Sequence, residues 1–280
     1  METFLAPAKI NLCLHVLGRR ENGYHDLAML MQRVSLYDRI GISLIEGSAI
    51  RVHCGGVVLP SGQQNIAARA AEALFEQAGI RQGLEIAIEK HIPVAAGLGG
   101  GSSDAATVLM ALNDMLGLDF TPDQLMKVGV KLGADVPFFI FKHPAWATGI
   151  GDKLEEVKGL PPVWYVLVNP GLEVSTAWVY QNLRLTTPRD NLRIPRFSGT
   201  LDEVVALLYN DLEAVTAERF PLVGEVKQQL IDLGAAGALM SGSGSTVFGV
   251  FSDEDRARAA VEKLSVRPGW RAFAVAPVDD

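Results

Sequence analysis

Apolar and polar residues alternate in two segments of the chain, a pattern that is typical of β-strands. In residues 9–16 the aliphatic side chains occupy every second position, so Lys9 and Asn11 share the opposite face. Residues 84–89 repeat this alternation and lead into a glycine-rich segment. The pattern therefore predicts two half-buried strands, the second of which ends in a loop.

Apolar residues at helical spacing predict helices over much of the remaining chain. Gly79 and Gly133 are expected to end two of these helices, and Ser252 followed by Asp255 resembles a capping box for the last one. Short apolar runs predict further strands. The predicted helices are residues 65–78, 102–116, 122–132, 201–219, 224–233 and 253–264, and the further strands are residues 164–168, 245–251 and 271–276.

Helices and strands that interleave in this way indicate an α+β sandwich, with helices against one face of a sheet. A length of 280 residues fits one large domain or two joined ones. We place the junction of two closely packed domains near residues 153–160. The polar residues 182–199 are interpreted as a long surface connection.

Charge and composition exclude several classes of function. The chain carries 25 Lys and Arg against 32 Asp and Glu, a formal charge of −7, which gives no general attraction to nucleic acids or anionic membranes. The most apolar stretches, residues 136–141 and 163–168, are far shorter than the roughly 20 residues that cross a bilayer. Residues 1–12 (METFLAPAKINL) lack the basic segment and long apolar run that a secretory signal needs, so we predict no export. We expect a cytoplasmic protein.

The two cysteines, Cys13 and Cys54, show neither metal-ligand nor redox spacing. We interpret them as reduced thiols, as in cytosolic proteins, although the sequence leaves open whether they pair. The five histidines show no metal-ligand spacing either. We therefore predict no metal site made of protein side chains alone.

Residues 93–104, with the sequence PVAAGLGGGSSD, are typical of an anion-binding loop. Glycines let the backbone approach a phosphate, and the first amides of the following helix have no intrahelical partner. A Walker A loop would need a lysine, and a dinucleotide fingerprint would need a glycine at Ser102. A flexible turn that binds nothing is the alternative, which we disfavour because Ser102, Ser103 and a helix start follow directly. The two serines suit both capping and binding of phosphate.

Three ordered segments resemble the signatures of the GHMP kinases, named for galactokinase, homoserine kinase, mevalonate kinase and phosphomevalonate kinase. They are residues 7–12 (PAKINL), residues 93–103 and residues 241–246 (SGSGST). The sequence departs at Ala96, where many members have glycine or serine, and we expect a small change in loop shape. The third segment has the composition of a flexible linker, but its apolar flanks favour a tight loop that closes the site.

Three further segments narrow the resemblance. Residues 23–27 (GYHDL), 133–137 (GADVP) and 209–213 (YNDLE) are similar to the branch of this superfamily that phosphorylates diphosphocytidyl-methylerythritol. The resemblance implies an α+β, two-domain GHMP kinase fold. Its N-terminal α/β domain, residues 1–155, would bind ATP, its C-terminal ferredoxin-like sandwich would comprise residues 156–280, and the active site would lie between them.

The resemblance also implies a catalytic pair, Lys9 and Asp135. Transfer of a phosphoryl group to an alcohol needs a group that accepts or orients the hydroxyl proton, and positive charge for the reacting oxygens. Asp135 precedes an apolar run, so a nearby cation would help to keep it ionised. Without the resemblance, a solvated lysine and a turn residue would be the simpler interpretations. The expected cofactors are ATP and the Mg²⁺ that accompanies it.

The resemblance implies substrate contacts as well. Tyr24 and Tyr180 would stack on the cytosine ring, His25 would bind the edge of the pyrimidine, and Asn11 would contact the substrate. For each, a core or turn residue is the ordinary alternative. The residues that would bind the nucleotide are Asn65, Pro93, Val94, Ala95, Ala96, Gly97, Leu98, Gly99, Gly100, Gly101, Ser102 and Ser103.

Two other functions stay open at this point. A related kinase acting on mevalonate, homoserine or another small alcohol would share ATP binding without needing Tyr24, His25 and Tyr180. A nucleotide-sensing module would bind ATP without catalysis, which Lys9 and Asp135 argue against. In each case the partner is a small molecule rather than a nucleic acid or a membrane, and we expect a monomer or a weak homodimer.

Overall fold

The computed structural model describes residues 1–21, 23–55, 64–184 and 194–279. These residues divide into two compact units, each built from several stretches of the chain. The first unit comprises Met1–Ala8, Leu36–Ile92 and Gly99–Lys142, and the second comprises Lys9–Ser35, Pro93–Leu98 and His143–Asp280. The predicted division at residues 155 and 156 stays a prediction.

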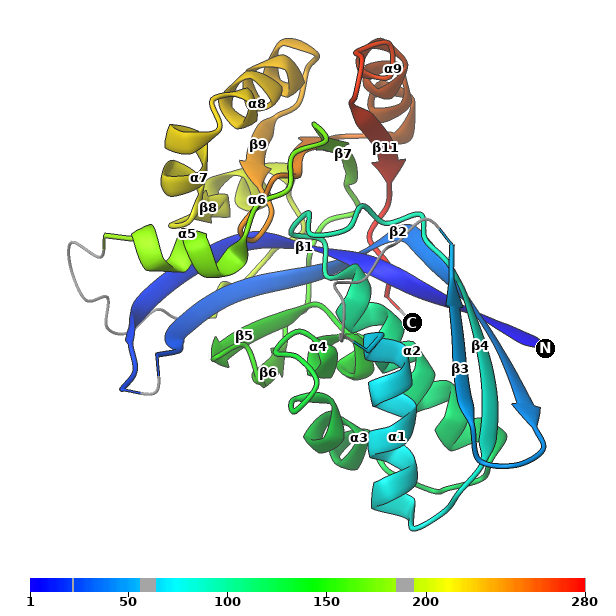
Figure 1. Ribbon diagram of the computed structural model, residues 1–280. Helices are drawn as coiled ribbons and strands as arrows, with labels where there is room; N and C mark the ends of the chain where they lie inside the picture. Colours follow the sequence, from blue (N-terminus) through cyan, green and yellow to red (C-terminus); the bar gives the residue numbers. More distant parts are fainter. Residues whose placement is uncertain (22, 56–63, 185–193, 280) are drawn as a thin grey trace. The chain divides into compact units, whose positions relative to one another are not determined.

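The first unit combines part of a sheet with a group of helices (Figure 1). Strand β4 (Gly83–Glu89) pairs antiparallel with the end of β2 (His25–Ile45) and parallel with β3 (Ile50–Cys54). Because β3 and β4 are parallel, the chain returns between them through helix α1 (Ile66–Ala78). Helix α2 (Gly100–Met115) packs against α1, α3 (Pro122–Gly129) and α4 (Val136–Phe141), and these four helices form the helical layer.

The ends of α1 follow from the residues at its termini. The side chain of Asn65 accepts a hydrogen bond from the backbone N–H of Ala67 at 2.8 Å, and Gly79 adopts a left-handed φ of +66° at the C-terminus. The predicted helix of residues 65–78 is confirmed. The predicted end at Gly133 is wrong, because α3 ends at Gly129, where a Cβ would lie 2.7 Å from Val136 of α4.

The second unit contains an antiparallel sheet with the strand order β11-β7-β10-β9. The pattern of buried residues explains the central position of β10, one of the two inner strands, since every residue of β10 is buried. Figure 1 shows α8 beside β9 and α9 beside β11, so helices cover this sheet as the sequence predicts. The bounds are β7 (Trp164–Asn169), α8 (Leu222–Asp232), β9 (Gly237–Met240), β10 (Val247–Phe251), α9 (Glu254–Leu264) and β11 (Arg271–Val275).

Strand β1 (Glu2–Arg19) has residues in both units, as does β2. In the second unit, β2 pairs with β5 (Ala145–Gly149), which pairs with β6 (Lys153–Glu156). The prediction that the strand around residues 9–16 is half-buried is wrong. Lys9 and Asn11 on its polar face are only 4% and 1% exposed, so both faces of the strand lie in the interior.

The predicted single helix of residues 201–219 is also wrong. The segment forms α6 (Leu201–Leu207), the short strand β8 (Tyr209–Asn210) and α7 (Glu213–Arg219). Strand β8 pairs parallel with β1, and the Asn210 side chain donates to the carbonyl oxygens of Met240 and Gly242, both at 2.8 Å. These hydrogen bonds replace the ones that a continuous helix would form. The sequence prediction missed them because helical periodicity does not report competing partners far away in the chain.

The start of α9 differs from the predicted capping box in a similar way. Asp253, rather than Ser252, is the N-cap residue, and its carboxylate accepts a hydrogen bond from the N–H of Arg256 at 2.9 Å. The Ser252 hydroxyl donates to Asp253 instead, at 2.7 Å. A carboxylate at this position also interacts favourably with the positive end of the helix dipole.

Candidate active site

The three signature segments meet within the second unit, through hydrogen bonds between their backbones and serine side chains. The carbonyl oxygen of Leu98 accepts from the Lys9 N–H at 3.0 Å, and that of Ala96 accepts from the Thr246 N–H at 3.3 Å. The Ser241 hydroxyl donates to the carbonyl oxygen of Gly97 at 2.9 Å. The first, second and third signatures therefore belong to one hydrogen-bonded cluster.

Gly97 occupies a position that no other residue fits. Its φ is +78°, and a Cβ there would lie 2.0 Å from the carbonyl oxygen of Ser241. Gly242, with a φ of +57°, approaches Gly97 from the opposite loop. Residues 241–246 are all buried, so the expectation of a tight loop rather than a flexible linker is confirmed.

Lys9 and Asn11 lie together, as the alternation along β1 predicts. The Lys9 ammonium donates to the Asn11 Oδ1 at 2.6 Å, and both side chains are buried. The backbone N–H of Asn11 in turn donates a hydrogen bond to the hydroxyl oxygen of Ser241, at 3.3 Å. The ammonium group is thus held in a fixed position beside the loop of residues 241–246, which is what stabilisation of a developing charge requires.

The predicted substrate residues are brought together in part. The His25 and Tyr180 rings stack with their centroids 4.9 Å apart and an interplanar angle of 25°. Tyr180 lies on α5 (Thr176–Asn182), and the Thr176 hydroxyl is 2.8 Å from that of Ser243 in the glycine-serine loop. Tyr24, expected to stack on the same base, is 59% exposed. The structure thus pairs Tyr180 with His25.

Burial lowers the pKa of His25, and the charge of Arg19 lowers it further. The imidazole is therefore neutral at pH 7, since its ordinary pKa already lies near 6.5. A neutral imidazole carries one donor and one acceptor nitrogen. It can therefore form hydrogen bonds of either kind with the edge of a pyrimidine.

The first turn of α2 lies in the first unit and begins two residues earlier than predicted. Gly99 precedes the helix with a φ of +72°, and its carbonyl oxygen accepts from the Ser103 N–H at 2.9 Å. Ser102 and Ser103 therefore lie inside the first turn, and the expectation that they cap the helix is wrong. The Ser103 hydroxyl is buried and has no hydrogen-bond partner among the described residues.

Asp135 and Asn65 lie in the same unit as this turn. Asp135 occupies the N-cap position of α4 and is half-buried. The turn before it passes close to α2, because a Cβ at Gly133 would lie 3.4 Å from the Oγ of Ser102. The predicted catalytic partner, Lys9, belongs to the other unit.

Comparisons with known proteins agree with these signatures. Models of the GHMP kinases N terminal domain and the GHMP kinases C terminal domain match residues 65–143 and 192–267. The chain is 81% identical to the 4-diphosphocytidyl-2-C-methyl-D-erythritol kinase of Syntrophotalea carbinolica, with each chain fully covered, and 60% identical to that of Geobacter sp. strain M21, with 97% of each covered. It belongs to this kinase family.

Solved structures place the kinase in the same fold. A crystal structure of 4-(cytidine 5'-diphospho)-2C-methyl-D-erythritol kinase is 40% identical and covers both chains fully, with a TM-score of 0.81. A homoserine kinase from Cytophaga hutchinsonii shares the fold at 16% identity, with a TM-score of 0.75. The predicted two-domain GHMP kinase fold and the resemblance to this family are confirmed. The roles of individual site residues stay predictions.

A charged cluster that the sequence analysis missed lies at the base of the kinase's glycine-rich loop. Lys90 is the residue after β4, and its ammonium bridges the carboxylates of Asp38 and Asp104. Asp38 also accepts from the N–H groups of His91 and Ile92, at 2.6 and 2.9 Å. Lys90 and Asp104 flank the loop in the sequence. Asp38 precedes Lys90 by 52 residues, so no local pattern could have joined it to the cluster.

Burial raises the pKa of Asp104 to about 7, while the neighbouring Lys90 charge opposes this rise. Burial alone would lower the pKa of Lys90, but the two carboxylates outweigh it and raise that pKa. The Asp104 proton is therefore bound more tightly in the folded kinase than in the unfolded chain. Its contribution to stability is present below pH 4 and is lost as the pH rises through about 7.

Asp104→Asn is therefore expected to change the pH dependence of stability. The asparagine side chain can still accept a hydrogen bond from Lys90 through its amide oxygen. Unlike the wild-type carboxyl group, it never has to ionise in a buried position. Relative to the wild type, its free energy of unfolding should improve between pH 5 and pH 7.5, as measured by urea unfolding at both pH values. An equal difference at both would contradict the raised pKa of Asp104.

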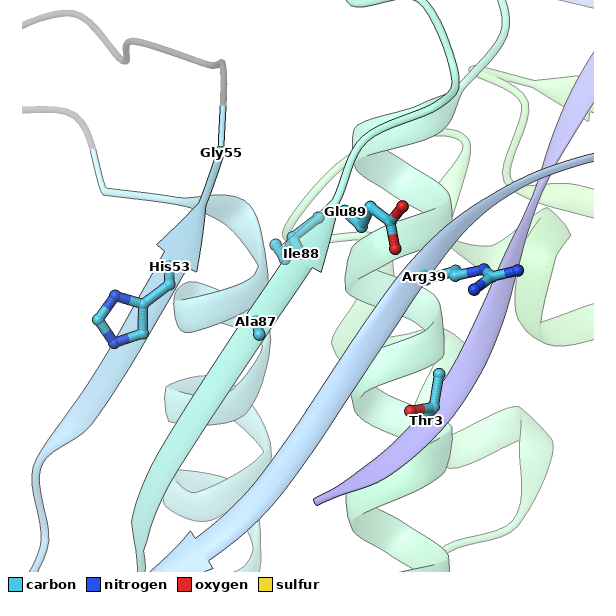
Figure 2. Close-up of a pocket in the computed structure, with 7 residues that line it drawn as sticks. All are labelled: Thr3, Arg39, His53, Gly55, Ala87, Ile88 and Glu89. Carbon is cyan, nitrogen blue, oxygen red and sulfur yellow. The ribbon is translucent and has the colours of Figure 1, made fainter.

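A cavity of about 400 Å³ lies elsewhere on the first unit (Figure 2). Figure 2 shows the Arg39 and Glu89 side chains among those lining it, so the wall carries both charges. None of the predicted site residues lines this cavity. Its lining residues are Thr3, Arg39, His53, Gly55, Ala87, Ile88 and Glu89.

In the parts of the chain described here, no helix is long and apolar enough to cross a membrane.

Cys13 and Cys54 are both free thiols, which answers the question of pairing that the sequence left open. Burial raises the pKa of Cys13 to about 11. Its thiol is therefore protonated at neutral pH and is a poor nucleophile.

Proposed function

We propose that this protein transfers the γ-phosphoryl group of ATP to the 2-hydroxyl group of 4-diphosphocytidyl-2-C-methyl-D-erythritol, releasing ADP. The single observation that carries the proposal is the 81% identity, over the full length, to a kinase named for this substrate. The cluster of signature segments around Gly97 supports it independently. The reaction belongs to the synthesis of isoprenoid precursors without mevalonate.

Each part of the site then has a chemical role. Backbone amides in residues 97–103 bind the phosphates of ATP, as amides at a helix N-terminus do in other proteins. Asp135 accepts the proton of the attacking hydroxyl, and Lys9 stabilises the charge that develops on the transferred group. The hydrogen bond from Lys9 to Asn11 positions the ammonium group. We assign Asn65 to contact with the nucleotide.

Mg²⁺ enters this scheme with the nucleotide. In the described residues, no group of three His, Cys, Asp or Glu side chains is placed to bind a metal ion. Mg²⁺ keeps several of its waters and is usually bound through substrate phosphates and one or two carboxylates. In the proposed reaction Mg²⁺ would be held mainly by the phosphates of ATP, and it would supply positive charge to the transferred group.

The activity is tested by ADP release with a panel of alcohols and Mg²⁺. We expect turnover with 4-diphosphocytidyl-2-C-methyl-D-erythritol, and ³¹P NMR should show a new phosphomonoester on its 2-hydroxyl group. Turnover with mevalonate or homoserine alone would instead favour another GHMP kinase. If ATP binds but no alcohol in the panel is phosphorylated, a nucleotide-sensing module becomes the better explanation.

Recognition of cytidine predicts a large effect at Tyr180. Removing a stacking partner costs about 1–3 kcal/mol per base, so Tyr180→Ala should raise the KM for the cytidine substrate by roughly 5- to 150-fold. The KM for ATP should change little. Tyr180→Phe is the matched control and should keep most of the affinity, because the ring remains. An unchanged substrate KM in Tyr180→Ala would show that the base binds elsewhere.

A further inference from the structure

The Lys90 cluster joins the two ends of the glycine-rich loop within the first unit. Lys90 follows β4, just before the loop, and its ammonium donates to Asp104 in the first turns of α2, just after the loop, at 2.8 Å. The same ammonium donates to Asp38, whose carboxylate also accepts hydrogen bonds from the backbone N–H groups of His91 and Ile92. The chain therefore enters and leaves the loop through one hydrogen-bonded group.

The cluster is buried, which makes its geometry strict. The Lys90 side chain is 11% exposed and that of Asp38 is fully buried. Charges in such a place are costly unless they are paired, so the three side chains constrain one another. One buried oxygen of Asp104 has no partner among the described residues. The hydrogen bond from Lys90 to the other Asp104 oxygen therefore connects Lys90 to helix α2.

The ammonium also lies directly against the first turn of α2. A Cβ at Gly100 would be 3.2 Å from the Lys90 Nζ, so this turn rests on the charged group. Gly100 is the first residue of α2, and its amide belongs to the set assigned to the phosphates. A displacement of Lys90 would therefore shift the donors that bind ATP.

We propose that Lys90, held between Asp38 and Asp104, is a positioning residue that aligns the backbone amides of the first turn of α2 with the phosphates of ATP. The Lys90 side chain acts through the helix rather than through a direct contact with the phosphates. The proposal deepens the function proposed above and rests on ATP binding at this loop. It does not depend on which alcohol is the acceptor.

The test compares nucleotide binding in Lys90→Met with the wild type, by calorimetric titration of a non-hydrolysable ATP analogue. We expect the affinity for the analogue to fall at least about tenfold, which is the size expected when a misaligned backbone amide loses one hydrogen bond to a charged phosphate. Adenosine, measured by competition, should bind equally to both proteins, because it has no phosphates. Equal losses for the analogue and adenosine would indicate general disruption and overturn the proposal.

A double variant separates positioning from charge balance. Lys90→Met leaves the carboxyl groups of Asp38 and Asp104 buried without a neighbouring cation, although Asp38 keeps its two backbone hydrogen bonds. Lys90→Met with Asp104→Asn removes one of these carboxyl groups and should recover stability. Because the bridge is still absent, affinity for the ATP analogue should remain low. Recovery of both stability and affinity would show that Lys90 only neutralises charge, and the proposal would be wrong.

Leu74→Ala provides the control for instability, since Leu74 is fully buried on α1, away from the loop. We expect it to lower stability without changing the affinity for the analogue; a matching loss of affinity would overturn the proposal. Failure of the proposed function gives a different result, because the wild type would then bind the analogue without phosphorylating the cytidine substrate.

Discussion

Asp135→Asn is expected to lower kcat by about 10²- to 10⁴-fold, the range that general acid–base catalysis contributes, with little change in the affinity for ATP. The asparagine keeps the shape of the side chain at the N-cap position of α4 but cannot accept the proton of the attacking hydroxyl. The measurement is steady-state ADP release, with nucleotide affinity determined separately by calorimetry.

Asp123→Asn is the matched control, since Asp123 is an exposed carboxylate in the first turn of the neighbouring helix α3. It should leave kcat within about twofold of the wild type.

Lys9→Ala should reduce kcat severely, as Asp135→Asn does, because the ammonium group that is hydrogen-bonded to Asn11 is removed. Near-normal turnover in both Asp135→Asn and Lys9→Ala would refute the assignment of the catalytic pair.

Gly97→Ala is expected to destabilise the protein by about 2–5 kcal/mol and to weaken ATP binding at least about tenfold. The alanine would need a left-handed backbone, and its Cβ would overlap the carbonyl oxygen of Ser241, 2.0 Å away. The loops of residues 93–98 and 241–246 would have to separate. Urea unfolding gives the change in stability, and titration with an ATP analogue gives the change in affinity.

Gly269→Ala isolates the backbone contribution to this effect. Its φ of +80° is close to that of Gly97, but a Cβ there meets no atom within 4 Å. It should cost only about 1–2 kcal/mol and leave the affinity for ATP unchanged. If the two variants lose the same stability, the close approach of the two loops does not restrict position 97.

The parts of the fold that the sequence predicted are those with local signals. Helix α1 was placed correctly because Asn65 and Gly79 mark its ends, and β4 because its alternation is regular. The division of residues 201–219 into α6, β8 and α7 was not predictable from periodicity. It depends on hydrogen bonds from Asn210 to residues about 30 positions away in the chain.

The candidate site divides in the same way. The glycine-rich loop and the glycine-serine loop were recognisable, because their composition reports their backbone conformation. The contact between Gly97 and Ser241 could not be recognised in the sequence, since 144 positions separate the two residues. The stack of His25 on Tyr180 and the bridge from Lys90 to Asp38 likewise join residues that carry no common pattern. Long-range contacts of this kind need the structure.

The most direct test is a crystal structure with an ATP analogue and a cytidine diphosphate ligand bound together. We expect the phosphates to accept hydrogen bonds from the backbone amides of residues 97–103, and an Asp135 oxygen to lie about 3 Å from the acceptor hydroxyl. Phosphates bound away from these amides, or an Asp135 side chain directed away from both ligands, would contradict the proposed site and its mechanism.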